Sequence, residues 1–306
     1  MTSFNITILG SNSAIPTLLR NPSSQVVNIN EQLYMIDCAD GTQVQLRKYK
    51  IKFKRINHIF ISHLHGDHYF GLIGLISSFH LLGRKNDLHI YAPPQLEKII
   101  NIQFEASKTV LNYPLHFHYL HQNITETIFE NNIITVKAFT LEHSIPTWGF
   151  IFSEKQGKRN IIKSFANEMS IPYNEYLKIQ NGANFIDSDG KVYKNKSITT
   201  DPPKVRSYAY CSDTGYFEKI IPVIKDVDTL YHESTFAEDK KESAKEKFHS
   251  TAKDAARIAQ KANVKKLLLG HYSSRYKDTS PLLEEAKSIF PNTALSYDGL
   301  VFEIKQ

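Results

Sequence analysis

Four side chains that can bind a transition metal fall within six residues of this sequence. His63, His65, Asp67 and His68 follow one another as H-x-H-x-D-H, between an apolar strand at residues 59–61 and a predicted apolar helix. Neutral imidazole and carboxylate are the usual nitrogen and oxygen ligands of zinc. We expect Gly66 to let the chain fold back, so that His63 and His65 point one way and Asp67 and His68 another. That arrangement favours two neighbouring metal ions over one.

Further ligands are expected where other strands end. His143 follows the strand predicted at 133–139, Asp213 follows the one at 206–211, and His271 follows the one at 267–269. Open α/β sheets place their ligands at such strand ends. A carboxylate such as Asp213 can bridge two metal ions. His249 lies between a polar loop and a helix, where it could reach a substrate as an acid.

The remaining histidines lack this placement, and we interpret them as structural. They are found at positions 58, 80, 89, 116, 118, 121 and 232.

Strands and helices alternate along the chain and predict an α/β fold of two sheets with helices outside. The expected strands cover residues 4–10, 23–29, 32–37, 59–61, 88–92, 115–120, 127–129, 133–139, 206–211, 229–233 and 265–270. Helices are expected near 42–50, 70–82 and 95–110, and after Thr251, which forms a capping-box pattern with Asp254.

Residues 153–200 differ in character from the rest. Turn signals crowd this segment, including Asn181-Gly182 and Ser188-Asp189-Gly190, and its lysines outnumber its acids. We therefore expect one domain over residues 1–306 with an inserted, projecting arm at about 153–200.

Composition suggests a cytoplasmic protein. The two cysteines, Cys38 and Cys211, form no C-x-x-C pair, so we expect His and Asp to hold any zinc. The first residues do not resemble a signal peptide, and no apolar run reaches the roughly 18 residues of a membrane span. The net charge of +6 is compatible with a polyanionic partner without requiring one.

The chain resembles the ribonuclease Z family, tRNA 3′-processing endonucleases of the metallo-β-lactamase fold. The motifs that carry the resemblance are Asp37-Cys38, Ser62-His63-Leu64-His65-Gly66-Asp67-His68, Glu142-His143-Ser144-Ile145-Pro146, Ser212-Asp213-Thr214, His232-Glu233-Ser234-Thr235-Phe236, His249-Ser250-Thr251-Ala252 and Gly270-His271-Tyr272-Ser273-Ser274-Arg275-Tyr276. The last two are far more specific than the H-x-H-x-D-H motif, which indicates only the superfamily.

This resemblance implies an αββα sandwich of two facing mixed sheets with outer helices. It also implies two Zn²⁺ per subunit, with Mn²⁺ or another divalent ion as the alternative. His63, His65, His143 and Asp213 would hold one ion, and Asp67, His68, Asp213 and His271 the other. Asp67 would accept a proton, His249 with Glu233 would assist the leaving group, and Asp37 would orient the histidine cluster. Precursor tRNA and a second copy of the chain are the implied partners.

The arm departs from the family pattern. Family members often carry a glycine- and proline-rich tip, whereas residues 169–178 here contain few glycines and an acid, Glu175. Two other functions are considered: a different dinuclear-metal hydrolase of this fold, such as a cyclic nucleotide phosphodiesterase or thioester hydrolase, and a metal-free RNA-binding scaffold. The arm and His249 would lack a clear task in the first, and the second would be signalled by missing ligands.

Overall fold

The computed structural model describes residues 3–305, which divide into two compact units. One comprises the described residues up to Ser153 together with Arg206–Lys305, and the other comprises Glu154–Val205. The first unit carries two large sheets, and the second is a small mixed unit with a core of its own. Among the described residues, no helix is long and apolar enough to cross a membrane.

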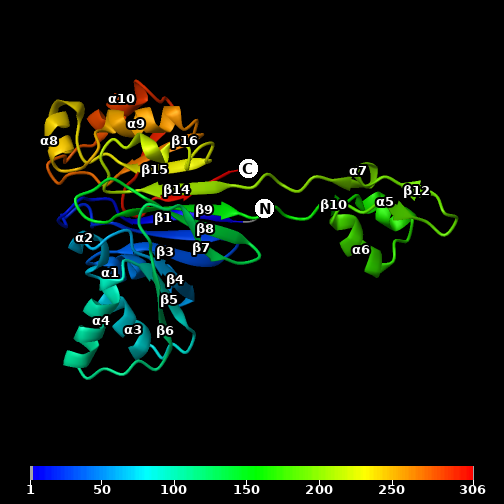
Figure 1. Ribbon diagram of the computed structural model, residues 1–306, viewed down its shortest axis with the longest axis horizontal. Coiled ribbons are helices and arrows are strands. Elements are labelled where there is room, and N and C mark those ends of the chain that lie inside the picture. The colour runs from blue at the N-terminus through cyan, green and yellow to red at the C-terminus, as the bar shows by residue number, and fades with distance from the viewer. Residues whose placement is uncertain (1–2, 306) are drawn as a thin grey trace. The chain divides into compact units, whose positions relative to one another are not determined.

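Two seven-stranded sheets form the centre of the first unit within residues 3–305 (Figure 1). The first has the order β18-β1-β2-β3-β4-β5-β6 and the second β17-β16-β15-β14-β9-β8-β7. Their strands are β1 (Phe4–Gly10), β2 (Ser24–Ile29), β3 (Gln32–Cys38), β4 (Ile56–Phe60), β5 (Leu88–Ala92), β6 (Leu115–Tyr119), β7 (Glu126–Glu130), β8 (Ile134–Thr140), β9 (Trp148–Glu154), β14 (Ser207–Cys211), β15 (Thr229–Glu233), β16 (Lys266–Gly270), β17 (Thr293–Leu295) and β18 (Val301–Glu303). Strands β3 to β6 run parallel, as do β14 to β17, so each sheet is mixed.

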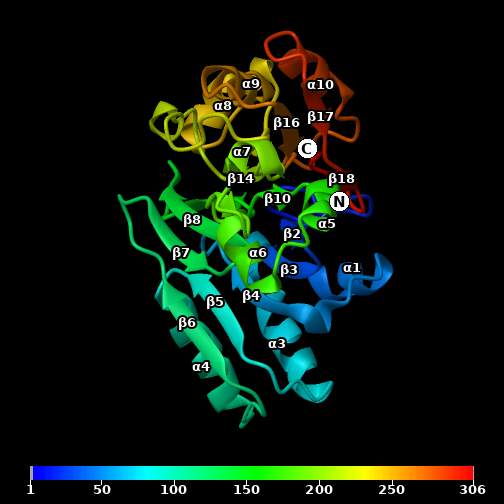
Figure 2. The ribbon, with the colours of Figure 1, turned by 90° about the vertical axis from the view of Figure 1, so that its right-hand side faces the viewer.

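Helices cover the outer faces of both sheets, as Figures 1 and 2 show. Those of the first unit are α1 (Thr42–Lys48), α2 (Gly66–Tyr69), α3 (Leu72–Leu81), α4 (Gln95–Ala106), α8 (Lys241–Glu246), α9 (Ala252–Lys261) and α10 (Ser280–Lys287). Helices α3 and α4 lie outside the first sheet, and α9 and α10 outside the second. The layer order is therefore helix, sheet, sheet, helix.

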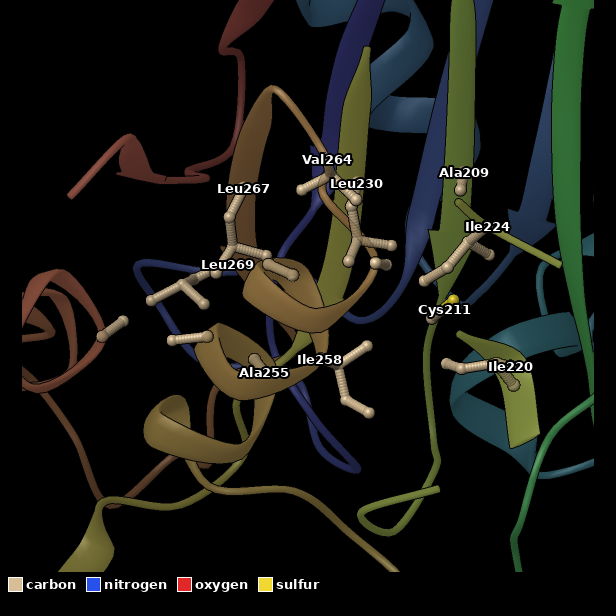
Figure 3. Packing of buried hydrophobic residues seen from close by; sticks show 14 of the residues in the cluster. Ala209, Cys211, Ile220, Ile224, Leu230, Ala255, Ile258, Val264, Leu267 and Leu269 are labelled. Atoms are coloured by element: carbon tan, nitrogen blue, oxygen red, sulfur yellow. The ribbon is translucent and has the colours of Figure 1, made fainter. Parts of the chain in front are cut away.

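Three hydrophobic clusters hold these layers together. The cluster between the sheets contains large aromatic side chains such as Phe60, Trp148 and Phe150. Another packs α9 against the second sheet, where Ala255 and Ile258 face Leu267 and Leu269 (Figure 3). Small alanines on one face of α9 let this helix approach the strands closely. This close packing fixes the residues that immediately precede α9. The predicted capping box is present, with the Thr251 hydroxyl accepting from the Asp254 amide at 3.1 Å.

Most elements lie where the sequence predicted them, but β4 covers Ile56–Phe60 rather than residues 59–61. Helix α4 ends at Ala106 rather than near residue 110, because Lys108 takes a left-handed conformation with φ of 51°. Strand β9, in which Trp148 to Phe152 are all buried, was not expected from the sequence. The short elements α8, α10, β17 and β18 were also not expected.

The second unit folds around a small apolar cluster. It contains the two-stranded pairs β10 (Asn160–Ile161) with β13 (Thr199–Thr200) and β11 (Phe185–Ile186) with β12 (Val192–Tyr193), and the helices α5 (Lys163–Glu168), α6 (Tyr173–Gln180) and α7 (Asn195–Ile198). Its core contains Ala166, Ile171, Ile179, Phe185 and Ile198. The arm expected at about 153–200 falls within this unit.

Candidate dinuclear metal centre

The H-x-H-x-D-H motif lies at the carboxyl end of β4. His63 and His65 belong to the loop after Phe60, and Asp67 and His68 belong to α2. Gly66 is the first residue of α2 and directly follows the extended His65. A Cβ at this position would lie 2.1 Å from a carbon of the Phe70 ring.

The second sheet brings the scattered residues to the same place. His143 follows β8, Asp213 follows β14, and His271 follows β16. Asp213 and His271 have φ angles of 58° and 57°, and Asp37, at the end of β3, has 55°. Such left-handed conformations are uncommon outside glycine and cluster at functional sites. These three residues bring their side chains together where the strands of the two sheets end.

Three imidazoles converge with one oxygen of Asp213. Nδ1 of His65 lies 3.1 Å from His63 Nε2 and 3.2 Å from His143 Nε2. Oδ1 of Asp213 lies 3.9 Å from each of those two Nε2 atoms. The four ligand atoms lie within 4.8 Å of one another, as the donors of one metal ion would.

The other oxygen of Asp213 faces a different group. Oδ2 lies 3.0 Å from His68 Nε2 and 3.2 Å from His271 Nε2. Oδ2 of Asp67 lies 3.6 Å and 3.7 Å from the same two nitrogens. The carboxylate of Asp213 therefore stands between two donor groups, the position of a bridging ligand.

Hydrogen bonds on the far side of the rings orient these ligands. Asp37, which is fully buried, accepts from His68 Nδ1 at 2.7 Å, from the Ser62 amide at 2.7 Å and from the Tyr210 hydroxyl at 2.7 Å. His271 Nδ1 lies 3.0 Å from Thr235 Oγ1. When one ring nitrogen is hydrogen-bonded in this way, the other is directed at the metal.

The carboxylates of the site favour positive charge beside them. Burial alone would lower the pKa of His68, but Asp213, Asp37 and Asp67 raise it well above its usual value. Burial holds the pKa of His63 well below its usual value, so that ring is neutral and able to bind a metal.

The donor set fits two divalent cations. Nε2 of His68 and of His271 are buried, and neither makes a hydrogen bond within residues 3–305. Both nitrogens lie in ion-pair contact with Asp213 Oδ2, at 3.0 Å and 3.2 Å. Buried polar nitrogens without partners are costly, and a bound cation at this point would satisfy both.

His249 and Glu233 form a separate pair beside the donor groups. His249 Nδ1 donates to Glu233 Oε1 at 2.8 Å. Burial alone would lower the pKa of His249, but the charge and hydrogen bond of Glu233, helped by Asp213 and Asp67, raise it to about 9. Glu233 is fully buried and also accepts from the amides of Thr214 and Ser250. His249 is therefore held protonated and in a fixed orientation.

A cavity of about 310 Å³ opens onto these residues. Its lining includes His65, Asp67, His143, His249 and His271, together with Lys247 and Phe248. A larger neighbouring cavity of about 980 Å³ shares His249 and Phe248 and is lined by Tyr216, Lys241, Lys245 and Arg257 among others.

Every site residue expected from the sequence lies in this centre, but several supporting groups were missed. These are Ser62, Thr235, Tyr210 and the backbone amide of Ala14, which donates to Asp67 Oδ2 at 2.7 Å. Ser62 and Thr235 lie within motifs quoted from the sequence, but no role was assigned to them there. Tyr210 carries no local signal, because its role follows from strand packing.

The chain matches a family model and a curated protein. Residues 4–290 match the family model described as Anti-Pycsar protein Apyc1. A curated protein of Phocaeicola vulgatus named Ribonuclease Z is 47% identical over 305 residues, covering 100% of this chain and 99% of its own length.

Solved structures agree with the fold. Human tRNase Z, short form, has a TM-score of 0.72 at 25% identity, covering 99% of this chain and 100% of its own. The metallo-β-lactamase fold protein YhfI from Bacillus subtilis has a TM-score of 0.69 at 18% identity, covering 98% and 99%. The expected metallo-β-lactamase fold is thereby confirmed.

Proposed function

Because the chain belongs to the ribonuclease Z family, as well as to the family described as Anti-Pycsar protein Apyc1, we propose that it is a zinc-dependent endoribonuclease that removes the 3′ trailer from precursor tRNA. Hydrolysis would leave a 3′-hydroxyl on the tRNA and a 5′-phosphate on the trailer. The names of the curated relative and of the human structure support the substrate. The donor geometry supports the reaction class.

The observation that carries the proposal is the placement of Asp213 between two donor groups. His63, His65 and His143 lie on its Oδ1 side, and Asp67, His68 and His271 on its Oδ2 side. Two divalent ions bound by these residues would supply a nucleophilic hydroxide near neutral pH and would stabilise the entering and departing oxygens of a phosphodiester. We assign Zn²⁺ because imidazole and carboxylate are its usual nitrogen and oxygen donors, although Mn²⁺ accepts the same set.

Asp67 is the proton acceptor in this proposal. Burial alone would raise the pKa of Asp67, but the charges of His68 and His271 lower it, so the carboxyl is ionised. The amide of Ala14 fixes its Oδ2. An ionised, immobile carboxylate at the mouth of the cavity can accept the proton of the attacking water.

His249 is the proton donor. The bond that breaks joins phosphorus to the 3′ oxygen of the tRNA, and this oxygen is a poor leaving group without a proton. His249 lines the cavity and keeps its proton because Glu233 accepts from Nδ1. That leaves Nε2 to deliver a proton to the departing oxygen, after which Glu233 holds the neutral ring in place.

The second unit is the proposed tRNA-binding arm. Residues 154–205 contain nine Lys and Arg against six Asp and Glu. A cavity of about 800 Å³ in this unit is lined by Lys158, Arg159 and Lys204, among others. Phosphate contacts depend on charge more than on a fixed order of residues, so an arm without a glycine-rich tip can still bind the RNA backbone.

A homodimer is proposed on the family resemblance alone, with the arm of one subunit serving the other's site. Light scattering of the purified protein tests it, with twice the monomer mass of 35.1 kDa expected. A monomer that cleaves precursor tRNA at full rate would refute this part.

The proposed reaction is tested by the ends of its products. We expect the tRNA to be extended by a polymerase that needs a 3′-hydroxyl, and the trailer to be degraded by an exonuclease that needs a 5′-phosphate. A 2′,3′-cyclic phosphate on the tRNA would contradict the proposal, because it requires attack by the ribose 2′-hydroxyl instead of water.

A further inference from the structure

A second group of histidines lies toward the amino ends of neighbouring strands in the first sheet. His58 on β4 is paired in register with His89 on β5, which is paired with His116 on β6. Their ring centroids are 5.0 Å and 4.8 Å apart, and the rings are inclined by only 12° and 16°. This spacing is that of neighbouring strands, so the imidazoles stack as a ladder on one face.

The ladder is distinct from the proposed catalytic centre. His89 and His116 are the second residues of β5 and β6, at their amino ends, whereas the H-x-H-x-D-H motif follows the carboxyl end of β4. From the sequence we interpreted these histidines as structural, because none follows a strand. The pairing register of β4, β5 and β6 brings them together, and this register is not visible in the sequence of any single strand.

A carboxylate completes the group. Asp87 immediately precedes β5, and its Oδ2 lies 3.0 Å from His116 Nε2. One ligand atom each from Asp87, His89 and His116 lie within 4.8 Å of one another. Ligands about 2.0–2.2 Å from one ion are separated by distances of this order. His118 adds a fourth imidazole, with Nε2 3.0 Å from His89 Nδ1.

The group is accessible and in the form that binds metals. The side chains of His116 and Asp87 are 44% and 53% exposed, and His89 is half-buried. Burial, followed by the neighbouring histidines, lowers the pKa of His89, so the ring is neutral near pH 7. The nearby Arg84 donates to the carbonyl oxygens of Ile56 and Asp87, and the carboxylate of Asp87 faces His116.

We propose that Asp87, His89 and His116 bind one divalent transition-metal ion of the class that includes Zn²⁺. Two imidazoles and one carboxylate suit such ions, whereas Mg²⁺ and Ca²⁺ prefer oxygen ligands. Strand β6 is the outer strand of its sheet. An ion held jointly by β5 and β6 clamps this edge, and solvent fills its remaining positions.

The test is Zn²⁺ titration of the full-length protein, followed by calorimetry, after the catalytic centre has been loaded. His116→Gln and Asp87→Asn remove one ligand each at exposed positions. His121→Gln is the matched control, because His121 also pairs with a carboxylate, its Nδ1 lying 3.1 Å from Glu126 Oε1. Precursor cleavage and thermal unfolding without added Zn²⁺ report on the integrity of each variant.

We expect a further Zn²⁺-binding event in the wild type and in His121→Gln. The two ligand variants should lose it or bind at least about tenfold more weakly, since even a partner of a metal ligand contributes 10–100-fold to affinity. Cleavage should be unchanged in all of them, and Mg²⁺ should not compete. An unaltered event in both His116→Gln and Asp87→Asn would overturn the proposal, as would an equal loss in His121→Gln.

Discussion

Replacing Glu233 by Gln should make cleavage sensitive to alkali. In the wild type Glu233 keeps His249 protonated, because it raises the pKa of His249 from 6.5 to about 9. Removing the negative charge lets that pKa fall toward 6.5, because burial is then opposed only by the more weakly acting Asp213 and Asp67. The protonated form is the active one, so the rate is lost as the pH rises through the pKa.

The magnitude follows from the protonated fractions. At pH 8 a group with a pKa of about 9 is roughly 90% protonated and one with a pKa of 6.5 roughly 3%, a ratio of about 30. At pH 6 both are mostly protonated, and the ratio falls below about twofold. The rate of Glu233→Gln relative to the wild type should therefore drop steeply between pH 6 and pH 8.

The assay is single-turnover cleavage of precursor tRNA from pH 6 to pH 10, with metal content measured at each pH. Glu246→Gln is the matched control, because Glu246 lines the same cavity but is exposed and is not among the groups that shift the pKa of His249. Glu233 is buried and accepts backbone amides, so some loss of stability, about 1–3 kcal/mol, is expected. A constant ratio between Glu233→Gln and wild type at all pH values would refute the reasoning, as would an equal shift in Glu246→Gln.

The other predictions concern the metals and the arm. His65→Ala should abolish cleavage and lower the metal content with the fold retained by circular dichroism; unchanged activity would remove the metal proposal. Asp37→Asn should weaken metal affinity about 10–100-fold in chelator competition, since Asp37 orients His68, and wild-type affinity would contradict that role. Replacing residues 154–205 by a short turn is feasible because Ser153 and Ser207, on either side of this segment, pair across β9 and β14. It should raise KM for precursor tRNA and flatten its salt dependence but spare a small phosphodiester; loss of both activities would make the arm structural.

The site was predictable where neighbouring residues carry the chemistry. The motif from His63 to His68 is local, and His143, Asp213 and His271 could be found because each follows a strand. The sequence did not show that the two oxygens of Asp213 face different donor groups, because this depends on how the two sheets pack together. Tyr210 was missed for the same reason.

Most strands were predictable from local sequence pattern, including β15, which is buried along its whole length. The alternating strands β1 to β3 and the capped helix α9 were found, whereas β9, buried along most of its length, was not. The histidine ladder illustrates the limit most sharply. His58, His89 and His116 are unremarkable along the chain and become neighbours only through the register of three parallel strands.

The most direct test of the proposed function is cleavage of an end-labelled precursor tRNA beside a small chromogenic phosphodiester, with and without a chelator. The proposal predicts a single cut just after the discriminator base, which is lost with the chelator and restored by Zn²⁺. Turnover of the small diester with the precursor tRNA left intact would contradict it and indicate a phosphodiesterase of the same fold acting on another substrate.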